Sequence, residues 1–229
     1  MTDQFITPPF GVLFDMDGVI IDSNPFHKIC LERFFKKHQI YLSEANLVQR
    51  VYGRRNVEWI PYVFGRSLTP EEIQQYAEEK EQMFRKLYKD AIQPVEGLSE
   101  FLARLQEARI PCAIATSAPK ANLNFTLSHT HLGHFFQAVI YDEMVANGKP
   151  NPEVYLKAAS TIGLPPKKCL VFEDSLSGIE AGKEAGCIVI GITTSHSYQE
   201  LHRADLTIDN FTQLKPTTLQ PLFNNIKQH

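Results

Sequence analysis

Near the start of the chain, two acidic residues, Asp15 and Asp17, directly follow a short apolar run. Residues 12–14 (Val-Leu-Phe) favour a buried strand and Gly18 ends the run, so both carboxylates should lie at a strand's C-terminal end. Residues two apart in an extended segment face the same side, so Asp15 and Asp17 are expected to point at one spot. Converging carboxylates repel each other unless a cation or a shared proton lies between them. The pair therefore indicates a catalytic or metal site, with a plain strand-end turn as the alternative.

This pair of acids suits chemistry at phosphorus better than calcium binding. An aspartate can attack phosphorus as a nucleophile while a neighbouring acid serves the leaving group. An EF-hand is a poor fit because Val19 occupies a ligand position and no glycine follows it at the required place.

The composition is that of a globular protein with no nucleic-acid or membrane partner. The 229 residues are enough for a full core, or for one core with a smaller companion domain. A net charge of −3 gives no sign of a polyanion-binding surface, and no run approaches membrane-spanning length. Residues 1–9 contain neither a basic region nor an apolar signal core, so we expect a cytoplasmic protein. No CxxC pair occurs, and buried free thiols are expected at Cys30, Cys112, Cys169 and Cys187.

Two regions of different pattern divide the chain. Residues 23–91 have helical character and almost no strand signal. Within them, Thr69 and Pro70 with two following glutamates form a typical helix start, for a helix that reaches about Tyr88. Pro94 marks a boundary, after which strand-like and helix-like segments alternate.

The alternation is typical of βα units, which form a parallel sheet with helices on both faces. We therefore predict an α/β core of residues 1–22 and 92–229, with an α-helical domain of residues 23–91 inserted after the first strand. A module inserted there stands over the carboxyl ends of the strands, where open α/β sheets bind ligands. The later strands are expected at Cys112–Ala115, Ala138–Tyr141, Cys169–Phe172, Cys187–Ile192 and Leu206–Ile208. The helices between them are expected to include Pro152–Ile162, Ser175–Ala185 and one that begins near Pro119.

Polar residues that leave successive parallel strands share one rim of the sheet. Thr116 and Ser117 offer hydroxyls and backbone N–H groups suited to an anion after the second strand. Lys149 lies among prolines just before a helix, and Glu173 and Asp174 follow the fourth strand. Helix capping or surface charge explains each residue when it is taken alone. Together with the first pair of acids, they predict a site for a divalent cation and a tetrahedral dianion.

These four segments resemble, in the same order, the four motifs of the haloacid dehalogenase superfamily of phosphotransferases. The matching stretches include Asp-Met-Asp-Gly-Val at 15–19, Gly-Lys-Pro-x-Pro at 148–152 and Glu-Asp-Ser-x-x-Gly at 173–178. The resemblance spans nearly the whole chain and is closest to the β-phosphoglucomutase-like branch, which carries an α-helical cap domain. It implies a Rossmann-like parallel sheet, with residues 23–91 as the cap domain that selects the substrate.

The resemblance also implies roles for the core residues. Asp15 would be the nucleophile that accepts the phosphoryl group, Asp17 the general acid and base, and Thr116 and Lys149 the holders of the phosphoryl oxygens. An oxygen-only, carboxylate-rich site suits Mg²⁺, and the metal and Lys149 would neutralise charge that otherwise repels an anionic substrate. The residues implied for Mg²⁺ are Asp15, Asp17 through its backbone carbonyl, Asp174, and Glu173 as a supporting or direct ligand.

Substrate contacts are expected from one core residue and three cap residues: Ser117, His27, Arg54 and Lys80. Arg54 lies where this branch carries a substrate-contacting loop, and His27 and Lys80 align with the mutase group. Each has a plainer alternative, namely exposed charge for Arg54 and its neighbour Arg55, a charged helical face for Lys80, and packing for His27.

The expected function is Mg²⁺-dependent hydrolysis of a small phosphorylated metabolite, such as a sugar phosphate, by a monomeric enzyme through an aspartyl-phosphate. A β-phosphoglucomutase-type phosphomutase and a phosphonate- or pyrophosphate-cleaving variant stay open, because both would use the same core. A catalytically idle phospholigand-binding protein would lack the nucleophile or the lysine, and both are present.

Overall fold

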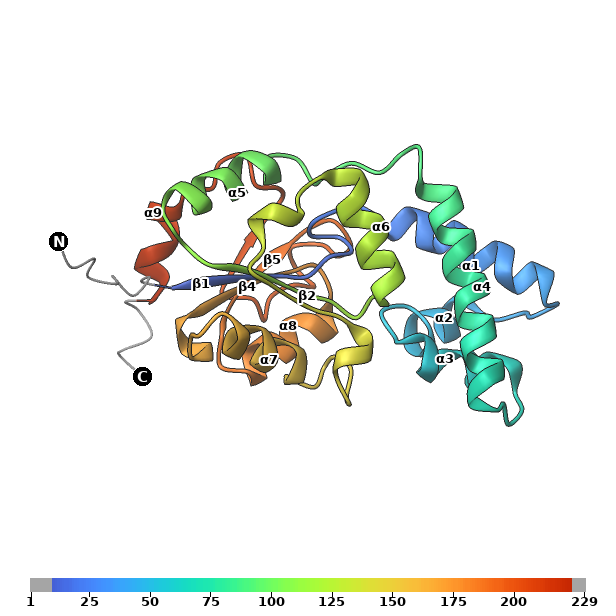
Figure 1. Ribbon diagram of the computed structural model, residues 1–229. Helices are drawn as coiled ribbons and strands as arrows, with labels where there is room; N and C mark the ends of the chain where they lie inside the picture. The colour runs from blue at the N-terminus through green and yellow to red at the C-terminus, as the bar shows by residue number, and fades with distance from the viewer. Residues whose placement is uncertain (1–9, 224–229) are drawn as a thin grey trace.

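The computed structural model describes residues 10–223, so the residues 1–9 on which the absence of a signal was argued lie outside it. Its sheet is parallel, with the strand order β3-β2-β1-β4-β5-β6 (Figure 1). The predicted parallel α/β fold is therefore confirmed. The strands are β1 Gly11–Phe14, β2 Cys112–Ala115, β3 Ala138–Ile140, β4 Cys169–Glu173, β5 Ile188–Ile192 and β6 Leu206–Ile208.

Helices cover both faces of the sheet (Figure 1). One face packs against α5 (Leu98–Glu107), α6 (Lys120–Thr130) and α9 (Pro216–Leu219). The other packs against α7 (Glu153–Thr161) and α8 (Leu176–Glu184). Short 3-10 turns occur at Gly133–Phe135, Asp142–Met144, Pro166–Lys168 and Gln220–Phe223.

The two faces of the sheet are filled differently. On the first, Phe14 stacks on Phe172 with ring centroids 5.2 Å apart, and Phe101 stacks on Phe211 at 5.5 Å. On the second, the core consists mainly of aliphatic side chains and alanines around Leu13. Successive strand residues alternate between these faces, as the pleat requires. Because both faces are covered, the strands read as continuous apolar runs in the sequence.

The pairing register brings the polar strand ends together. Phe14 of β1 lies opposite Ile114 of β2 and opposite Phe172 of β4. The residues that follow these three therefore emerge at neighbouring points on the carboxyl rim of the sheet. The chain order also reverses between β1 and β4, which is where open α/β sheets form their binding crevice.

The predicted helical region consists of α1 (Asn24–Lys37), α2 (Glu44–Arg50), α3 (Asn56–Phe64) and α4 (Pro70–Tyr88). These helices stand beside the carboxyl end of β1 (Figure 1) and have an apolar cluster of their own, in which Phe34 meets Trp59 edge-on at 5.8 Å. Ile29, which shares the helical spacing of the buried residues, is 40% exposed.

The helix α4 begins where the sequence predicts. The Thr69 hydroxyl accepts a hydrogen bond from the Glu72 N–H at 3.2 Å, and the Glu72 carboxylate accepts one from the Thr69 N–H at 2.8 Å. This reciprocal capping box satisfies two backbone donors that the first helical turn leaves unpaired. The helix ends at Tyr88, as expected.

The chain leaves the core and returns to it at adjacent points. Ile21 pairs with Pro94 in an isolated bridge, and the Val95 N–H donates to the Ile20 carbonyl at 2.9 Å. The two connections of the helical region therefore run side by side, next to the predicted boundaries at 22/23 and 91/92.

Two predictions from composition can be compared with residues 10–223. The four cysteines are free and buried, as expected. Among the helices of this part of the chain, none combines the length and apolar character needed to cross a bilayer.

Candidate active site

The Asp15 side chain lies at the C-terminal end of β1 and is almost fully buried. Its backbone N–H donates to the Phe172 carbonyl at 3.0 Å, which ties the segment to β4. Its Oδ1 lies 2.9 Å from Nζ of Lys149. Burial raises the pKa of Asp15 to about 7, against the lowering effect of Lys149. The Asp15 carboxylate is therefore held close to the Lys149 ammonium group, in a buried site that disfavours its ionised form.

The Glu173 carboxylate is completely buried, and both of its oxygens are engaged. Oε1 accepts from Lys149 Nζ at 2.5 Å and from the Tyr155 hydroxyl at 2.7 Å. Oε2 accepts from the backbone N–H groups of Asp174 and Ser175 and from the Ser175 hydroxyl, at 2.9–3.1 Å. Although burial opposes its charge, Lys149 and these donors hold the pKa of Glu173 below its usual value. Because both oxygens of Glu173 already accept these hydrogen bonds, Glu173 is better suited to holding Lys149 in place than to binding a metal ion directly.

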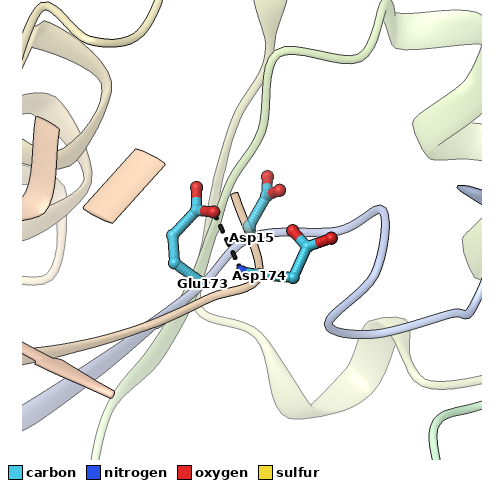
Figure 2. Close-up of side chains that lie close together, drawn as sticks. All are labelled: Asp15, Glu173 and Asp174. Atoms are coloured by element: carbon cyan, nitrogen blue, oxygen red, sulfur yellow. Dashed lines mark hydrogen bonds between the residues drawn. The ribbon is translucent and has the colours of Figure 1, made fainter. Parts of the chain in front are cut away.

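Three carboxylates form a cluster at this rim (Figure 2). One oxygen each of Asp15, Glu173 and Asp174 lie within 4.8 Å of one another, and all three residues are buried. Burial, with Glu173 and Asp15 nearby, raises the pKa of Asp174 well above its usual value. A buried cluster of this kind is relieved when a cation is shared by its oxygens. The all-oxygen donor set therefore fits the implied Mg²⁺, which the carboxylates of Asp15 and Asp174 could hold.

The Asp17 carboxylate does not join this cluster. It accepts from the Ser23 hydroxyl at 2.5 Å and lies 3.4 Å from Nε2 of His27. Although burial acts in the opposite direction, these contacts hold the pKa of Asp17 below its usual value. The expectation that both acids point at one spot relied on an extended backbone. Strand β1 instead ends at Phe14, and the chain turns at Gly18, whose φ is +78°.

The hydroxyl residues after β2 do not cap the following helix. Pro119 occupies the N-cap position of α6, and the Thr116 hydroxyl accepts from the Ala118 N–H at 3.0 Å. Thr116 is buried and Ser117 is half-buried. The capping alternative is therefore wrong for Thr116 and Ser117. It is correct for Ser175, whose hydroxyl accepts from the N–H of Gly178 at the start of α8.

His27 on α1 and Lys80 on α4 belong to a polar network that is largely buried. Lys80 Nζ lies 3.1 Å from Nδ1 of His27 and donates to Glu81 Oε1 at 2.9 Å. Glu81 also accepts from Asn56 at 2.8 Å and from Asn122 at 2.7 Å. Because Asn122 lies on α6, the network links the helical region to the core. The network also extends to Asp17 through His27.

The two arginines of the predicted substrate loop, Arg54 and Arg55, differ in their exposure and in their contacts. Arg54 is exposed. Arg55 forms an ion pair with Asp142 in the core and donates to the Ala146 carbonyl at 3.2 Å. Both side chains of this ion pair are 14% exposed. Arg55 therefore connects the helical region to the core, whereas Arg54 is free to face a ligand.

Four residues of the site were missed in the sequence: Asn24, Glu81, Tyr155 and Ser195. Tyr155 lies on α7 and Glu81 on α4. In the sequence, the only sign that they belong to the site is a polar group beside the apolar face of a helix. Ser195 follows β5, so extending the strand-end rule to a fifth strand would have found it. Asn24 is the first residue of α1, and its amide donates to Asp174 at 3.0 Å.

Replacing Gly178 with alanine is expected to destabilise the protein. A Cβ there would lie 1.7 Å from Glu173 Oε1, and the carboxylate cannot move without losing Lys149 and Tyr155. We expect a loss of about 2–4 kcal/mol in the free energy of unfolding, measured by urea denaturation. The exposed Gly163 would have no neighbour within 4 Å of a new Cβ but has a positive φ of +73°, so Gly163→Ala measures backbone strain alone. Equal losses in the two variants would contradict the role given to Gly178.

Stability in chelator is expected to fall as the pH rises from 5 to 8. A carboxyl with a raised folded-state pKa binds more protons in the folded state, so its stabilising proton is lost as the pH passes about 7. Asp15 should contribute roughly 2–4 kcal/mol over this window, and Asp174 acts in the same direction. Thermal unfolding at each pH, with EDTA and with Mg²⁺, measures the effect. Mg²⁺ should stabilise most at pH 8, and a stability that rises with pH in EDTA would contradict the assignment.

The comparisons with known proteins agree with this geometry. A family model described as haloacid dehalogenase-like hydrolase matches residues 12–192. A phosphorylated carbohydrates phosphatase from Thermotoga maritima is 30% identical over 176 residues, which cover 77% of this chain and 81% of that protein. The solved structure of β-phosphoglucomutase from Clostridium difficile is similar with a TM-score of 0.82 and 26% identity, covering 96% of this chain and 99% of the other.

A longer plant protein is also similar. It is the chloroplastic 5-amino-6-(5-phospho-D-ribitylamino)uracil phosphatase of Arabidopsis thaliana, 27% identical over 213 residues. The match covers 93% of this chain but only 57% of that relative's length. The stretch matched by the family model runs from β1 to β5 and contains each strand end that builds the acid cluster and its lysine. The chain belongs to the haloacid dehalogenase-like hydrolase family, in its β-phosphoglucomutase-like branch.

Proposed function

We propose that the protein is a Mg²⁺-dependent phosphatase that hydrolyses a small phosphorylated metabolite through an aspartyl-phosphate on Asp15. The observation that carries this is the pairing of Asp15 with Lys149 inside a buried three-carboxylate cluster. A carboxylate held there is dehydrated and fixed at a strand end, next to a cation that offsets the charge of an incoming phosphate. The names of the relatives, which include phosphatases of carbohydrates and other metabolites, support the same reaction.

In the first step, an Asp15 oxygen attacks phosphorus and the bond to the ester oxygen breaks. Lys149 and Thr116 bind phosphoryl oxygens as negative charge shifts onto them. Glu173 orients Lys149 through their buried contact. The Mg²⁺ held by Asp15 and Asp174 would further neutralise the charge of the phosphoryl group.

In the second step, water attacks the phosphorus of the aspartyl-phosphate and releases Asp15 and inorganic phosphate. Asp17 takes the proton from that water, after giving one to the leaving alcohol in the first step. The contacts of Asp17 with Ser23 and His27 favour its carboxylate form, which is the form that accepts a proton. The arrangement therefore suits the hydrolytic half of the cycle.

We further propose that residues 23–91 form the cap domain and select a sugar phosphate. We assign the substrate contact to Arg54, because its side chain is exposed while Lys80 and Arg55 are engaged in protein contacts. Ser117 would add a contact beside the phosphoryl group. The net charge of −3 favours a metabolite over a nucleic acid as the partner. We also propose that the protein is a cytoplasmic monomer.

A substrate panel tests the proposal. The purified protein is assayed for phosphate release from sugar phosphates, an aryl phosphate, a phosphonate and pyrophosphate, with Mg²⁺ and with EDTA. We expect hydrolysis of a sugar phosphate that depends on Mg²⁺. Full activity in EDTA, or no turnover of any phosphate ester, would contradict the proposal.

A second assay separates phosphatase from mutase. β-Glucose 1-phosphate is supplied with a trace of bisphosphate primer, and glucose 6-phosphate and free phosphate are measured together. We expect free phosphate as the main product, because hydrolysis needs no organised second acceptor. Stoichiometric glucose 6-phosphate with little free phosphate would identify a mutase instead.

A further inference from the structure

The amide of Asn24 and the hydroxyl of Ser195 meet at one oxygen of Asp174. Asn24 Nδ2 donates to Asp174 Oδ2 at 3.0 Å and to Ser195 Oγ at 2.5 Å. The Ser195 hydroxyl in turn donates to the same Oδ2. A closed triangle of hydrogen bonds therefore fixes one oxygen of this carboxylate.

The backbone at Gly18 also packs closely against Asp174. A Cβ at Gly18 would lie 2.0 Å from Asp174 Oδ2 and 2.8 Å from Asn24 Nδ2. The Gly18 carbonyl also accepts from the Thr194 hydroxyl at 2.6 Å. With Oδ2 held by two donors and pressed against this turn, Oδ1 is the oxygen left for the acid cluster.

The two donors come from different parts of the molecule. Ser195 lies in the loop that follows β5, in the α/β core. Asn24 is the first residue of α1, directly after the connection through which the chain enters the helical region. If the helical region rotated about that connection, Asn24 would move with α1, while Ser195 would stay with the core.

We propose that Asn24 is a positioning residue that couples cation binding at Asp174 to the position of the helical region. In the arrangement seen here, Asn24 and Ser195 together orient the carboxylate for the cation. When the helical region moves away, only Ser195 remains and the site binds the cation more weakly. The inference rests on the metal site proposed above.

Such coupling acts in both directions. If the position of the helical region changes the affinity for Mg²⁺, bound Mg²⁺ must favour that same position by an equal factor. Because Asn24 is the first residue of α1, Mg²⁺ alone, without substrate, should hold Asn24 in place and reduce fraying of the first turn of this helix. The amides of Phe26 and His27, both of which donate to the Ser23 carbonyl, report on this turn.

The test measures Mg²⁺ binding without turnover, by isothermal titration calorimetry on the full chain. We expect Asn24→Ala to weaken the binding of Mg²⁺ about tenfold, as is typical when a residue that orients a metal ligand is removed. Asn24→Gln, which keeps the amide but displaces it by one methylene, should be weakened as well. Asn46→Ala, on α2 of the same helical region, is the matched control and should bind within about twofold of the wild type.

Hydrogen exchange separates coupling from simple orientation. Mg²⁺ should slow exchange at Phe26 and His27 in the wild type and in Ser195→Ala, but not in Asn24→Ala. Wild-type affinity in both Asn24 variants, or equal slowing by Mg²⁺ in Asn24→Ala, would overturn the proposal. A wild-type protein that binds no Mg²⁺ would overturn the metal site itself, and this proposal with it. Circular dichroism of each variant confirms that the comparison is made on folded protein.

Discussion

Asp15→Asn is expected to lower turnover by at least about 10⁴-fold while making the metal-free protein more stable. The amide is a far weaker nucleophile and metal ligand than the carboxylate, so the chemical step is lost. The same change removes a buried charge whose pKa is raised to about 7 by its surroundings. We therefore expect the Tm in EDTA at pH 8 to rise by about 2–6 °C.

Opposite changes in activity and stability distinguish this prediction from misfolding. The measurements are initial rates on the best substrate and thermal unfolding in EDTA at pH 8. Asp90→Asn, just beyond the end of α4, is the control and should leave both values unchanged. A variant that keeps more than a few per cent of the wild-type rate would show that Asp15 is not the nucleophile.

Lys149→Met is expected to abolish activity and to destabilise the protein. Lys149 lies between Asp15 and Glu173, and its removal leaves two buried carboxylates without their cation. Breaking a buried ion pair by removing one partner costs about 3–5 kcal/mol. Urea denaturation at pH 8 in EDTA should show a loss of this size. Turnover should fall together with it, because the phosphoryl oxygens lose their positive partner.

A surface lysine provides the control. Lys183 pairs with Asp205 at 2.7 Å, and both side chains are about one-third exposed. Lys183→Met should cost no more than about 1 kcal/mol. If Lys149→Met cost no more than this control, the three-carboxylate cluster would not depend on Lys149 for its stability. Lys149→Arg tests geometry, since it keeps the charge but places a planar group where Nζ contacts two carboxylates.

Much of the fold was predictable from local patterns. Strand Cys112–Ala115 and the start of α4 at Thr69 occur as predicted, because a buried apolar run and a capping box are decided by neighbouring residues. Element ends were less accurate: β3 ends at Ile140, one residue before the prediction, and β5 begins after Cys187. These ends depend on the ladder partner and on turns such as that at Gly186, whose φ is +81°.

The sequence predicted the site only for residues that follow a strand directly, because the carboxyl ends of parallel strands meet at one rim of the sheet. That rule brought Asp15, Glu173 and Asp174 together, as the structure has them. The rule assumed an extended backbone at Asp17, whereas β1 ends at Phe14, so it did not give the contacts of Asp17 with Ser23 and His27. It also could not give the contacts of Lys80, whose partners Glu81 and His27 come together only when α1 and α4 pack.

The pairing of Ile21 with Pro94 has a consequence for how enzymes with new substrate specificities can arise. Both connections of the helical region run side by side, joined by the hydrogen bond from the Val95 N–H to the Ile20 carbonyl. The two ends of this region therefore lie close together. An unrelated helical unit with closely spaced ends can replace it without disturbing any strand register. Exchange of the whole helical region would therefore leave the acid cluster at the sheet rim in place.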